Sequence, residues 1–159
     1  MIYTSEIHTP ANTLQANPLI TVIETTAGII YVLKIYFPPG SSGLLHVQIM
    51  DAGYQLFPTT IGQSFSGDNL SLSFDETYPK FEPPYQLRVI SWNLDTEYDH
   101  VMQISIGQVS KEEYISRFIG STAIADALKS MTSVEFEKTM TRRKVIENLS
   151  AVYAVKEAE

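Results

Sequence analysis

The sequence predicts a mainly β protein, with an antiparallel β-sandwich or jelly roll over residues 1–109 and a helical C-terminal arm over residues 110–159. Three observations lead to this fold class. About seven short segments rich in β-branched and aromatic residues follow one another, with turn-forming residues and no helical pattern between them. Several of these segments alternate apolar and polar residues with a period of two. From Ser110 onward, helix-start signals and helical spacing replace that alternation.

The expected strands lie between clusters of glycine, proline, asparagine and aspartate. They are 19–24, 28–37, 44–50, 54–57, 70–74, 85–92 and 100–109. The alternation is clearest after the Gly67–Asn69 turn, where Leu70, Leu72 and Phe74 lie on one face of the strand. Pro79 and the pair at 83–84 are expected to interrupt the chain before the next strand. Short strands joined in this way favour antiparallel sheets.

The arm opens with a capping box, in which Ser110 is followed three residues later by Glu113. A short helix is expected over 122–130, and a second capping box at Thr132–Glu135 opens a helix predicted for 133–156. The apolar stripe of this long helix is more than a small sandwich edge covers, so we expect it to contact another chain. The interface residues expected on this helix are Phe136, Met140, Leu149 and Tyr153 on the buried side, with Arg142 and Arg143 in solvent or against acidic partners.

Composition narrows the possible functions. The chain has 159 residues, of which 44% are hydrophobic, and a net charge of −7. Residues 1–109 carry ten acidic and three basic groups, which argues against nucleic-acid binding because phosphates require a basic surface. The chain has no cysteine, and therefore no disulfide, thiolate zinc site or cysteine nucleophile. Neither a signal peptide nor an apolar run long enough to cross a membrane is recognised.

The stretch SWNLDTEYDH is the most motif-like part of the first 109 residues. Asp95, Glu97 and Asp99 alternate as calcium ligands do, which makes them weak candidates for a metal site. An EF-hand loop starting at Asp95 would need glycine at its sixth position, where His100 stands, and glutamate at its twelfth, where none stands. We therefore expect residues 93–99 to form a solvated loop between two strands. No catalytic constellation and no cofactor site are predicted.

Trp92 leads to a rival hypothesis from another class of function. Carbohydrate-binding sandwiches stack sugars on exposed aromatic rings, and Trp92 with the nine tyrosines supplies such rings. Trp92 is equally plausible as a core residue, and the two cases differ in whether its ring lies flat on the surface. A carbohydrate-binding module is therefore the alternative to a protein that acts through protein–protein contacts.

Three segments carry a resemblance: PPGSSGLLHVQI, QLFPTTIGQSFSGDNLSLSF and PPYQLRVISWNLDTEYDHVMQISI. Together they resemble small β-sandwich accessory proteins of virus particles, such as those on tailed-phage heads and necks. The resemblance covers residues 1–109 and rests on the texture of strands and turns. It implies a non-enzymatic structural protein located in the virion and made in the host cytoplasm. Its expected partners are further copies of itself and other capsid proteins, with no nucleic acid and no membrane.

Overall fold

A computed structural model describes residues 1–119, 122–132 and 134–141. The chain divides into two compact units, residues 1–109 and residues 110–159. The first unit consists of strands β1 (Ile2–Thr9), β2 (Leu19–Glu24), β3 (Gly28–Phe37), β4 (Leu45–Asp51), β5 (Tyr54–Phe57), β6 (Phe65–Ser66), β7 (Leu70–Lys80), β8 (Gln86–Asn93) and β9 (His100–Val109). The predicted class, mainly β with antiparallel sheets, is confirmed.

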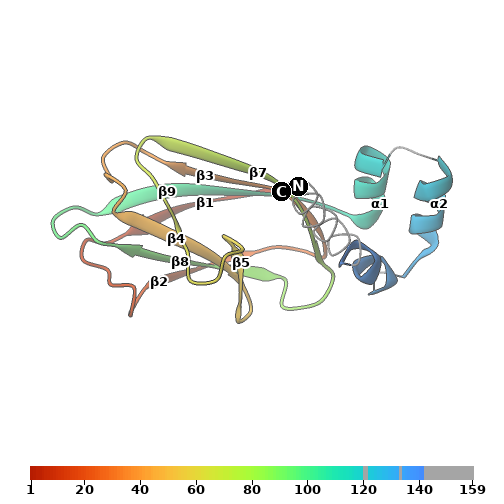
Figure 1. The fold of residues 1–159 in the computed structure, drawn as a ribbon, viewed down its shortest axis with the longest axis horizontal. Coiled ribbons are helices and arrows are strands. Elements are labelled where there is room, and N and C mark those ends of the chain that lie inside the picture. The colour runs from red at the N-terminus through yellow and green to blue at the C-terminus, as the bar shows by residue number, and fades with distance from the viewer. Residues whose placement is uncertain (120–121, 133, 142–159) are drawn as a thin grey trace, which may run out of the picture. The chain divides into compact units, whose positions relative to one another are not determined.

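The strands form two sheets that lie one over the other in Figure 1. The first sheet has the order β1-β9-β3-β7, and the second has the order β2-β8-β4-β5, with β6 also paired to β4. All of these pairings are antiparallel. The pairs are nested along the chain, because β1 pairs with β9, β2 with β8, β3 with β7, and β4 with β5 and β6. The polypeptide therefore follows the path of a long hairpin distributed over two sheets.

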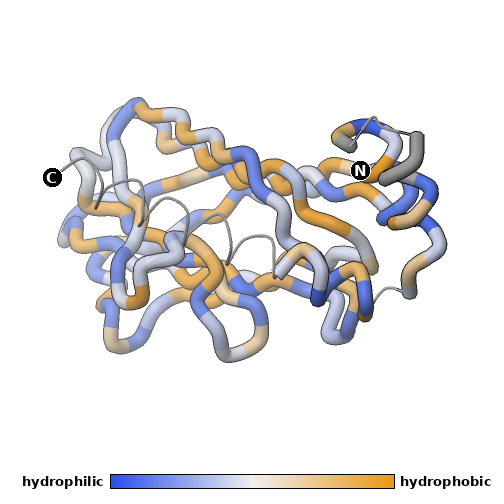
Figure 2. Tube along the Cα trace, turned by 45° about the vertical axis from the view of Figure 1, so that its right-hand side comes forward, coloured by the Kyte–Doolittle hydropathy of each residue, from blue (hydrophilic) through white to orange (hydrophobic). Residues whose placement is uncertain are grey.

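The core lies between the two sheets and follows from the period-two pattern. Alternate residues of each strand point inward, and Figure 2 shows hydrophobic and hydrophilic residues mixed along the strands. The second sheet contributes Leu45, Val47 and Ile49 from β4, all fully buried. Facing them are fully buried side chains of the first sheet, among them Leu33, Ile35, Met102, Ile104 and Ile106. The alternation read from the sequence thus identifies the buried face.

Three strands differ from the prediction, and one of them is the two-residue β6, which was not expected. Strand β1 was not anticipated, although it alternates and pairs along its whole length with β9. Strand β7 was expected to stop before Pro79, yet it continues to Lys80. It lies at an edge of the first sheet, where a missing N–H does not interrupt the ladder if it faces away from the neighbouring strand. Proline is a breaker of central strands and is tolerated at an edge.

A β-bulge in β3 accommodates a glycine of β9. Against β9 the register shifts between Ile30 and Val32, so the bulged residue is Tyr31. A Cβ atom on Gly107 would lie 2.4 Å from Cγ1 of Val32 and 2.8 Å from Cζ of Tyr31. Only a residue without a side chain fits beneath these two groups, so Gly107 lets the bulge pack closely.

The second unit begins with α1 (Lys111–Tyr114), which continues into a π-helical turn η1 (Ile115–Ile119) and is followed by α2 (Thr122–Ser130). The Ser110 hydroxyl accepts a hydrogen bond from the Glu113 backbone N–H at 3.2 Å, as the first capping box predicts. The buried Lys111 ammonium donates to the Met131 carbonyl at 2.5 Å and lies 6.0 Å from the centre of the Phe136 ring. The expected helix at 122–130 is confirmed.

The second capping box is also present. The Glu135 carboxylate accepts from the Thr132 backbone N–H at 2.9 Å, and the Glu135 N–H donates to the Thr132 hydroxyl at 3.3 Å. The bond from the Thr132 N–H above all, and a second from the Thr132 hydroxyl at 2.8 Å, hold the pKa of the Glu135 carboxyl below its ordinary value. Residues 134–141 are helical, and the rest of the predicted 133–156 helix lies outside the described residues. None of the helices that the structure describes is long and apolar enough to span a membrane.

Candidate functional site

Four loops gather at one end of the two sheets, which we call the loop end: residues 10–18, 38–44, 67–69 and 94–99. The strand register places them together. Thr9 at the end of β1 is opposite His100 at the start of β9, and Phe37 at the end of β3 is opposite Leu70 at the start of β7. In the second sheet, Leu45 is opposite Asn93. Every strand at this end therefore enters or leaves one of these loops.

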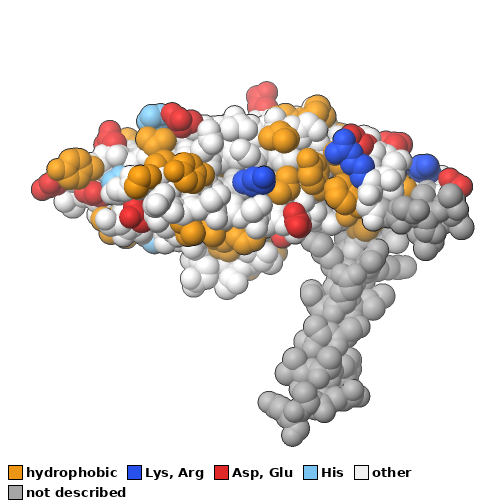
Figure 3. All heavy atoms as spheres, turned by 90° about the horizontal axis from the view of Figure 1, so that it is seen from above, with side chains coloured by type: hydrophobic (Ala, Val, Ile, Leu, Met, Phe, Trp, Pro, Cys, Tyr) orange, Lys and Arg blue, Asp and Glu red, His pale blue; other side chains and the backbone are white. Residues whose placement is uncertain are grey.

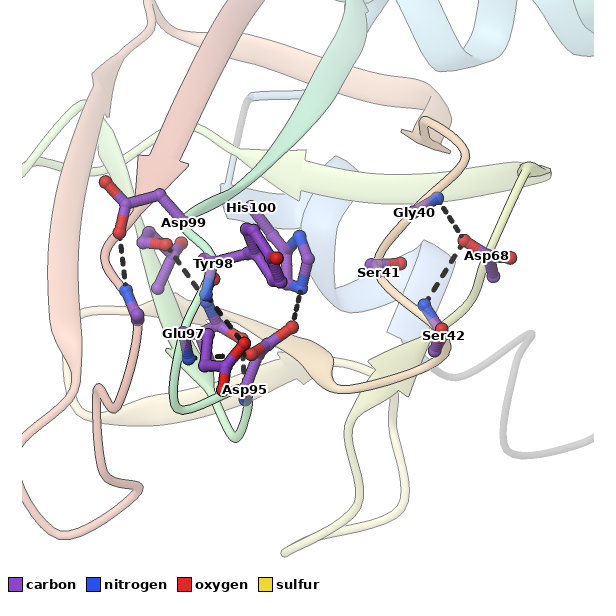
Figure 4. A network of polar contacts seen from close by, with 12 residues as sticks. Gly40, Ser41, Ser42, Asp68, Asp95, Glu97, Tyr98, Asp99 and His100 are labelled. Carbon is purple, nitrogen blue, oxygen red and sulfur yellow. Dashed lines mark hydrogen bonds and ion pairs between the residues drawn. The ribbon is translucent and has the colours of Figure 1, made fainter.

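Asp95 organises the 94–99 loop (Figure 4). One carboxylate oxygen accepts hydrogen bonds from the backbone N–H groups of Glu97 at 2.9 Å and Tyr98 at 3.2 Å. The other lies 3.0 Å from Nε2 of His100. The pKa of Asp95 is lowered, mainly because the Glu97 N–H stabilises the carboxylate. The Asp95 carboxylate thus stabilises the loop, and both of its oxygens bond to groups of residues 97–100.

A buried polar cluster anchors the same loop to both sheets. The hydroxyls of Thr9 in β1 and Ser91 in β8 are 2.8 Å apart, which joins the first sheet to the second. The Asn93 side-chain amide donates to the Tyr98 carbonyl at 2.9 Å and to the Thr9 carbonyl at 3.3 Å, and its oxygen accepts from the Asp95 N–H at 3.0 Å. Asn93 is fully buried, and both the nitrogen and the oxygen of its side-chain amide are hydrogen-bonded, so it fixes the loop relative to the strands.

The 38–44 and 67–69 loops are joined by a second aspartate. An Asp68 carboxylate oxygen accepts from the backbone N–H groups of Gly40 at 2.6 Å and Ser42 at 3.2 Å (Figure 4). The Ser41 hydroxyl donates to the Gly67 carbonyl at 2.5 Å. Gly40 and Ser42 both have positive φ angles, 117° and 48°. The loop end is thereby a hydrogen-bonded platform.

Three large apolar side chains are exposed on the loop end. Leu14 is 57% exposed, Leu94 is 49% exposed and Tyr98 is 66% exposed. The four loops contain aspartate and glutamate but no lysine or arginine. In Figure 3, hydrophobic side chains at the left end of the molecule lie among Asp and Glu side chains. The loop end is therefore a rigid, acidic and partly apolar surface, suited to contact with a macromolecule.

The predicted metal candidates do not converge. Asp95 is engaged within its loop, and Oδ1 of Asp99 accepts from the Ala11 N–H at 2.8 Å. Glu97 is exposed. In the described part of the chain, no group of three or more His, Asp or Glu side chains is arranged to hold a metal ion. The expected corner between two strands is present, as residues 94–99, since Asn93 belongs to β8.

Trp92 is not the exposed platform that a sugar would need. It is only 4% exposed, and its ring stacks on His46 of β4 at 5.3 Å between ring centres and 3° between ring planes. His46 accepts or donates a hydrogen bond at 3.0 Å to the Ser64 hydroxyl, and burial lowers the pKa of His46. The carbohydrate hypothesis thus loses its best residue and keeps only exposed tyrosines.

The interface residues predicted on the arm are described only in part. Phe136 and Met140 are buried, as expected for the apolar side of their helix. Their contact with another chain stays a prediction. Arg142, Arg143, Leu149 and Tyr153 lie outside the described residues.

Sequence reasoning missed a buried ion pair. Lys80 ends β7 in the first sheet and Asp51 ends β4 in the second, and the ammonium lies 2.7 and 2.8 Å from the two carboxylate oxygens. The Tyr78 hydroxyl donates to the same carboxylate at 2.8 Å. Lys80 is 4% exposed and Asp51 is 13% exposed. No sequence signal links two residues 29 positions apart, except that Lys80 is one of only three basic residues in 1–109.

The chain belongs to the class of mainly β proteins built from two antiparallel sheets. No family model matches it, and no curated protein matches its sequence. One solved structure with a weak resemblance is a chain from the capsid asymmetric unit of cyanophage Pam1. It is 11% identical, the match covers 67% of this chain and 81% of that chain, and the TM-score is 0.45. A likeness at this level carries no argument about function, which has to come from the molecule itself.

Proposed function

We propose that the sandwich is a jelly roll and that the protein is a non-enzymatic structural protein of a virus particle, assembling through protein–protein contacts. The nested pairing of β1 with β9, β2 with β8, β3 with β7 and β4 with β5 and β6 supports the jelly roll. Jelly rolls of eight strands recur in viral capsid proteins and in lectins. The fold therefore agrees with a virion role without establishing it.

The observation that carries the proposal is the surface of the loop end. Leu14, Leu94 and Tyr98 are exposed on loops that Asp95 and Asn93 hold by hydrogen bonds. Apolar groups on a preorganised surface bind a partner at low entropic cost, and tyrosine is enriched in the residues that dominate protein interfaces. The surrounding carboxylates favour a partner with a basic surface. A neighbouring capsid subunit of that charge is the partner that we propose.

The proposal is tested by the binding of purified protein to particles that lack it. Wild-type protein is expected to co-sediment with such particles, and Leu94→Lys and Tyr98→Lys are expected to reduce binding tenfold or more, which corresponds to about 1.4 kcal/mol. Tyr54→Lys is the matched control, because Tyr54 is 58% exposed and belongs to β5, outside the loop end.

Two outcomes contradict the proposal. The first is that wild-type protein fails to sediment with particles at any concentration. The second is that Tyr54→Lys weakens binding as much as the loop-end variants do. A glycan array with clear hits for the wild-type protein would instead favour the carbohydrate alternative.

A further inference from the structure

The free edge of β2 differs from the other sheet edges. Strand β2 ends the order of the second sheet, and within residues 1–119, 122–132 and 134–141 it pairs with β8 alone. Its sequence is LITVIE, so its first five residues carry no charge and no proline. An edge strand presents a row of backbone N–H and C=O groups that can pair with another strand. Proteins usually prevent this with charges, prolines, bulges or very short strands.

Each of the other edges in the described part has such protection. On β1, Glu6 and His8 are exposed and joined at 2.8 Å. On β7, Asp75 is exposed and Pro79 interrupts the row of N–H groups. Strand β5 has four residues, contains a bulge at Leu56 opposite Ile49 and Met50 of β4, and ends before a proline. Strand β2 alone is apolar and unprotected.

The side chains of β2 add an apolar surface to this edge. Leu19 and Ile23 face the core, and Ile20 and Val22 face outward, each 48% exposed. Ile20 is opposite Ile90 of β8, which is partly exposed on the same face. The apolar surface is thus continuous from the second strand of the sheet to its edge.

We propose that β2 pairs antiparallel with β2 of a second copy, which joins the second sheets of two sandwiches into one continuous sheet around a two-fold axis at Thr21. In this register Ile20 of each copy is opposite Val22 of the other copy on the outer face, so the two-fold axis gives two such pairs. Leu19 is opposite Ile23 on the inner face. The strand is therefore self-complementary.

Other registers are less favourable. A shift by one residue would set outward side chains against inward ones, because side chains alternate along a strand. Pairing centred on Val22 would place Ile20 against the Glu24 carboxylate of the second copy. The Thr21-centred register avoids both. This inference goes beyond the virion role, since two copies would pair in this way whether or not a particle is present, and it does not use the loop end.

The first test is sedimentation of the full chain over a concentration series. Strands of six residues form a small contact compared with a standard interface of about 1,600 Å², so we expect a reversible dimer with a dissociation constant on the order of tens of micromolar. The double variant Ile20→Lys with Val22→Lys sets like charges opposite one another and is expected to raise this constant at least tenfold. The matched control adds two lysines at other exposed apolar positions, Tyr54→Lys with Ile61→Lys.

A disulfide test determines the register, because the chain has no cysteine of its own. A mixture of Ile20→Cys and Val22→Cys chains is expected to form a cross-linked dimer several-fold faster than either variant alone, since only the mixed pair lies directly opposite. A wild-type chain that stays monomeric up to about 0.5 mM overturns the proposal. So does a control variant that weakens the dimer equally. Equal cross-linking by the single variants and the mixture overturns the Thr21-centred register.

Discussion

The ion pair of Lys80 and Asp51 allows the sharpest test of how the two sheets are held together. Replacing Lys80 by methionine keeps most of the side-chain volume and removes the charge. Asp51 then loses two hydrogen bonds, at 2.7 and 2.8 Å, and keeps that of Tyr78. Removing one partner of a buried pair costs about 3–5 kcal/mol. Because 13% of the Asp51 side chain remains in contact with solvent, we expect the lower limit, about 3 kcal/mol.

The assay is equilibrium unfolding in urea, with the free energy extrapolated to water. Lys34→Met is the matched control, because Lys34 is exposed on β3, and it is expected to change the free energy of unfolding by less than about 0.5 kcal/mol. The double variant Lys80→Met with Asp51→Leu removes both charges and is expected to be more stable than Lys80→Met alone. A loss below about 1 kcal/mol for Lys80→Met, or a double variant less stable than the single one, would refute the reasoning.

Three further predictions follow from the first unit. Gly107→Ala sets a methyl group against Val32 and is expected to cost about 2 kcal/mol in urea unfolding, whereas Gly53→Ala, with open space around it, should cost much less; equal losses would contradict the packing. Asp95→Asn is expected to destabilise the protein at neutral pH. Because the pKa of Asp95 is lower in the folded state, its carboxylate stabilises the fold above the unfolded-state pKa of about 3.9, and this stabilisation is lost as pH falls through the folded-state pKa. The urea midpoints of the wild type and the variant should therefore converge in acid, and a difference independent of pH would count against this role. A chain ending after Val109 is expected to unfold cooperatively by circular dichroism, since residues 1–109 have their own core; a chain without a cooperative transition would show that the helices belong to that core.

The strands were predictable where side-chain alternation and turn residues agree. Four strands have the predicted bounds, because local propensity and burial both favour a strand there: 19–24, 28–37, 54–57 and 100–109. Strand β1 was missed since its alternation mixes polar residues with few apolar ones, and its pairing with β9 depends on contacts about a hundred residues apart. The continuation of β7 through Pro79 depends on its position at an edge, which is a property of the sheet and not of the segment.

The candidate site was predictable only as a corner. The turn-forming composition of 94–99 predicts a loop, and the alternating carboxylates of Asp95, Glu97 and Asp99 suggest a metal site. The directions of the Asp95 and Asp99 carboxylates follow from backbone N–H groups that become available only once the loops have closed. Burial of Trp92 was equally hidden, because Trp92 lies on the outward side of β8 with Ile90, and His46 of β4 covers its ring there in part. Tertiary contacts therefore decide which of the singled-out residues are accessible.

The central proposal, a structural role in a virus particle, is tested most directly by measuring the protein in particles purified by density gradient from the producing culture. Quantitative mass spectrometry of the gradient fractions is expected to find the chain in the particle peak, at a fixed copy ratio to the capsid protein through repeated purification. A chain that stays in the soluble fractions, or whose ratio to the capsid protein falls with each purification step, would contradict the proposal.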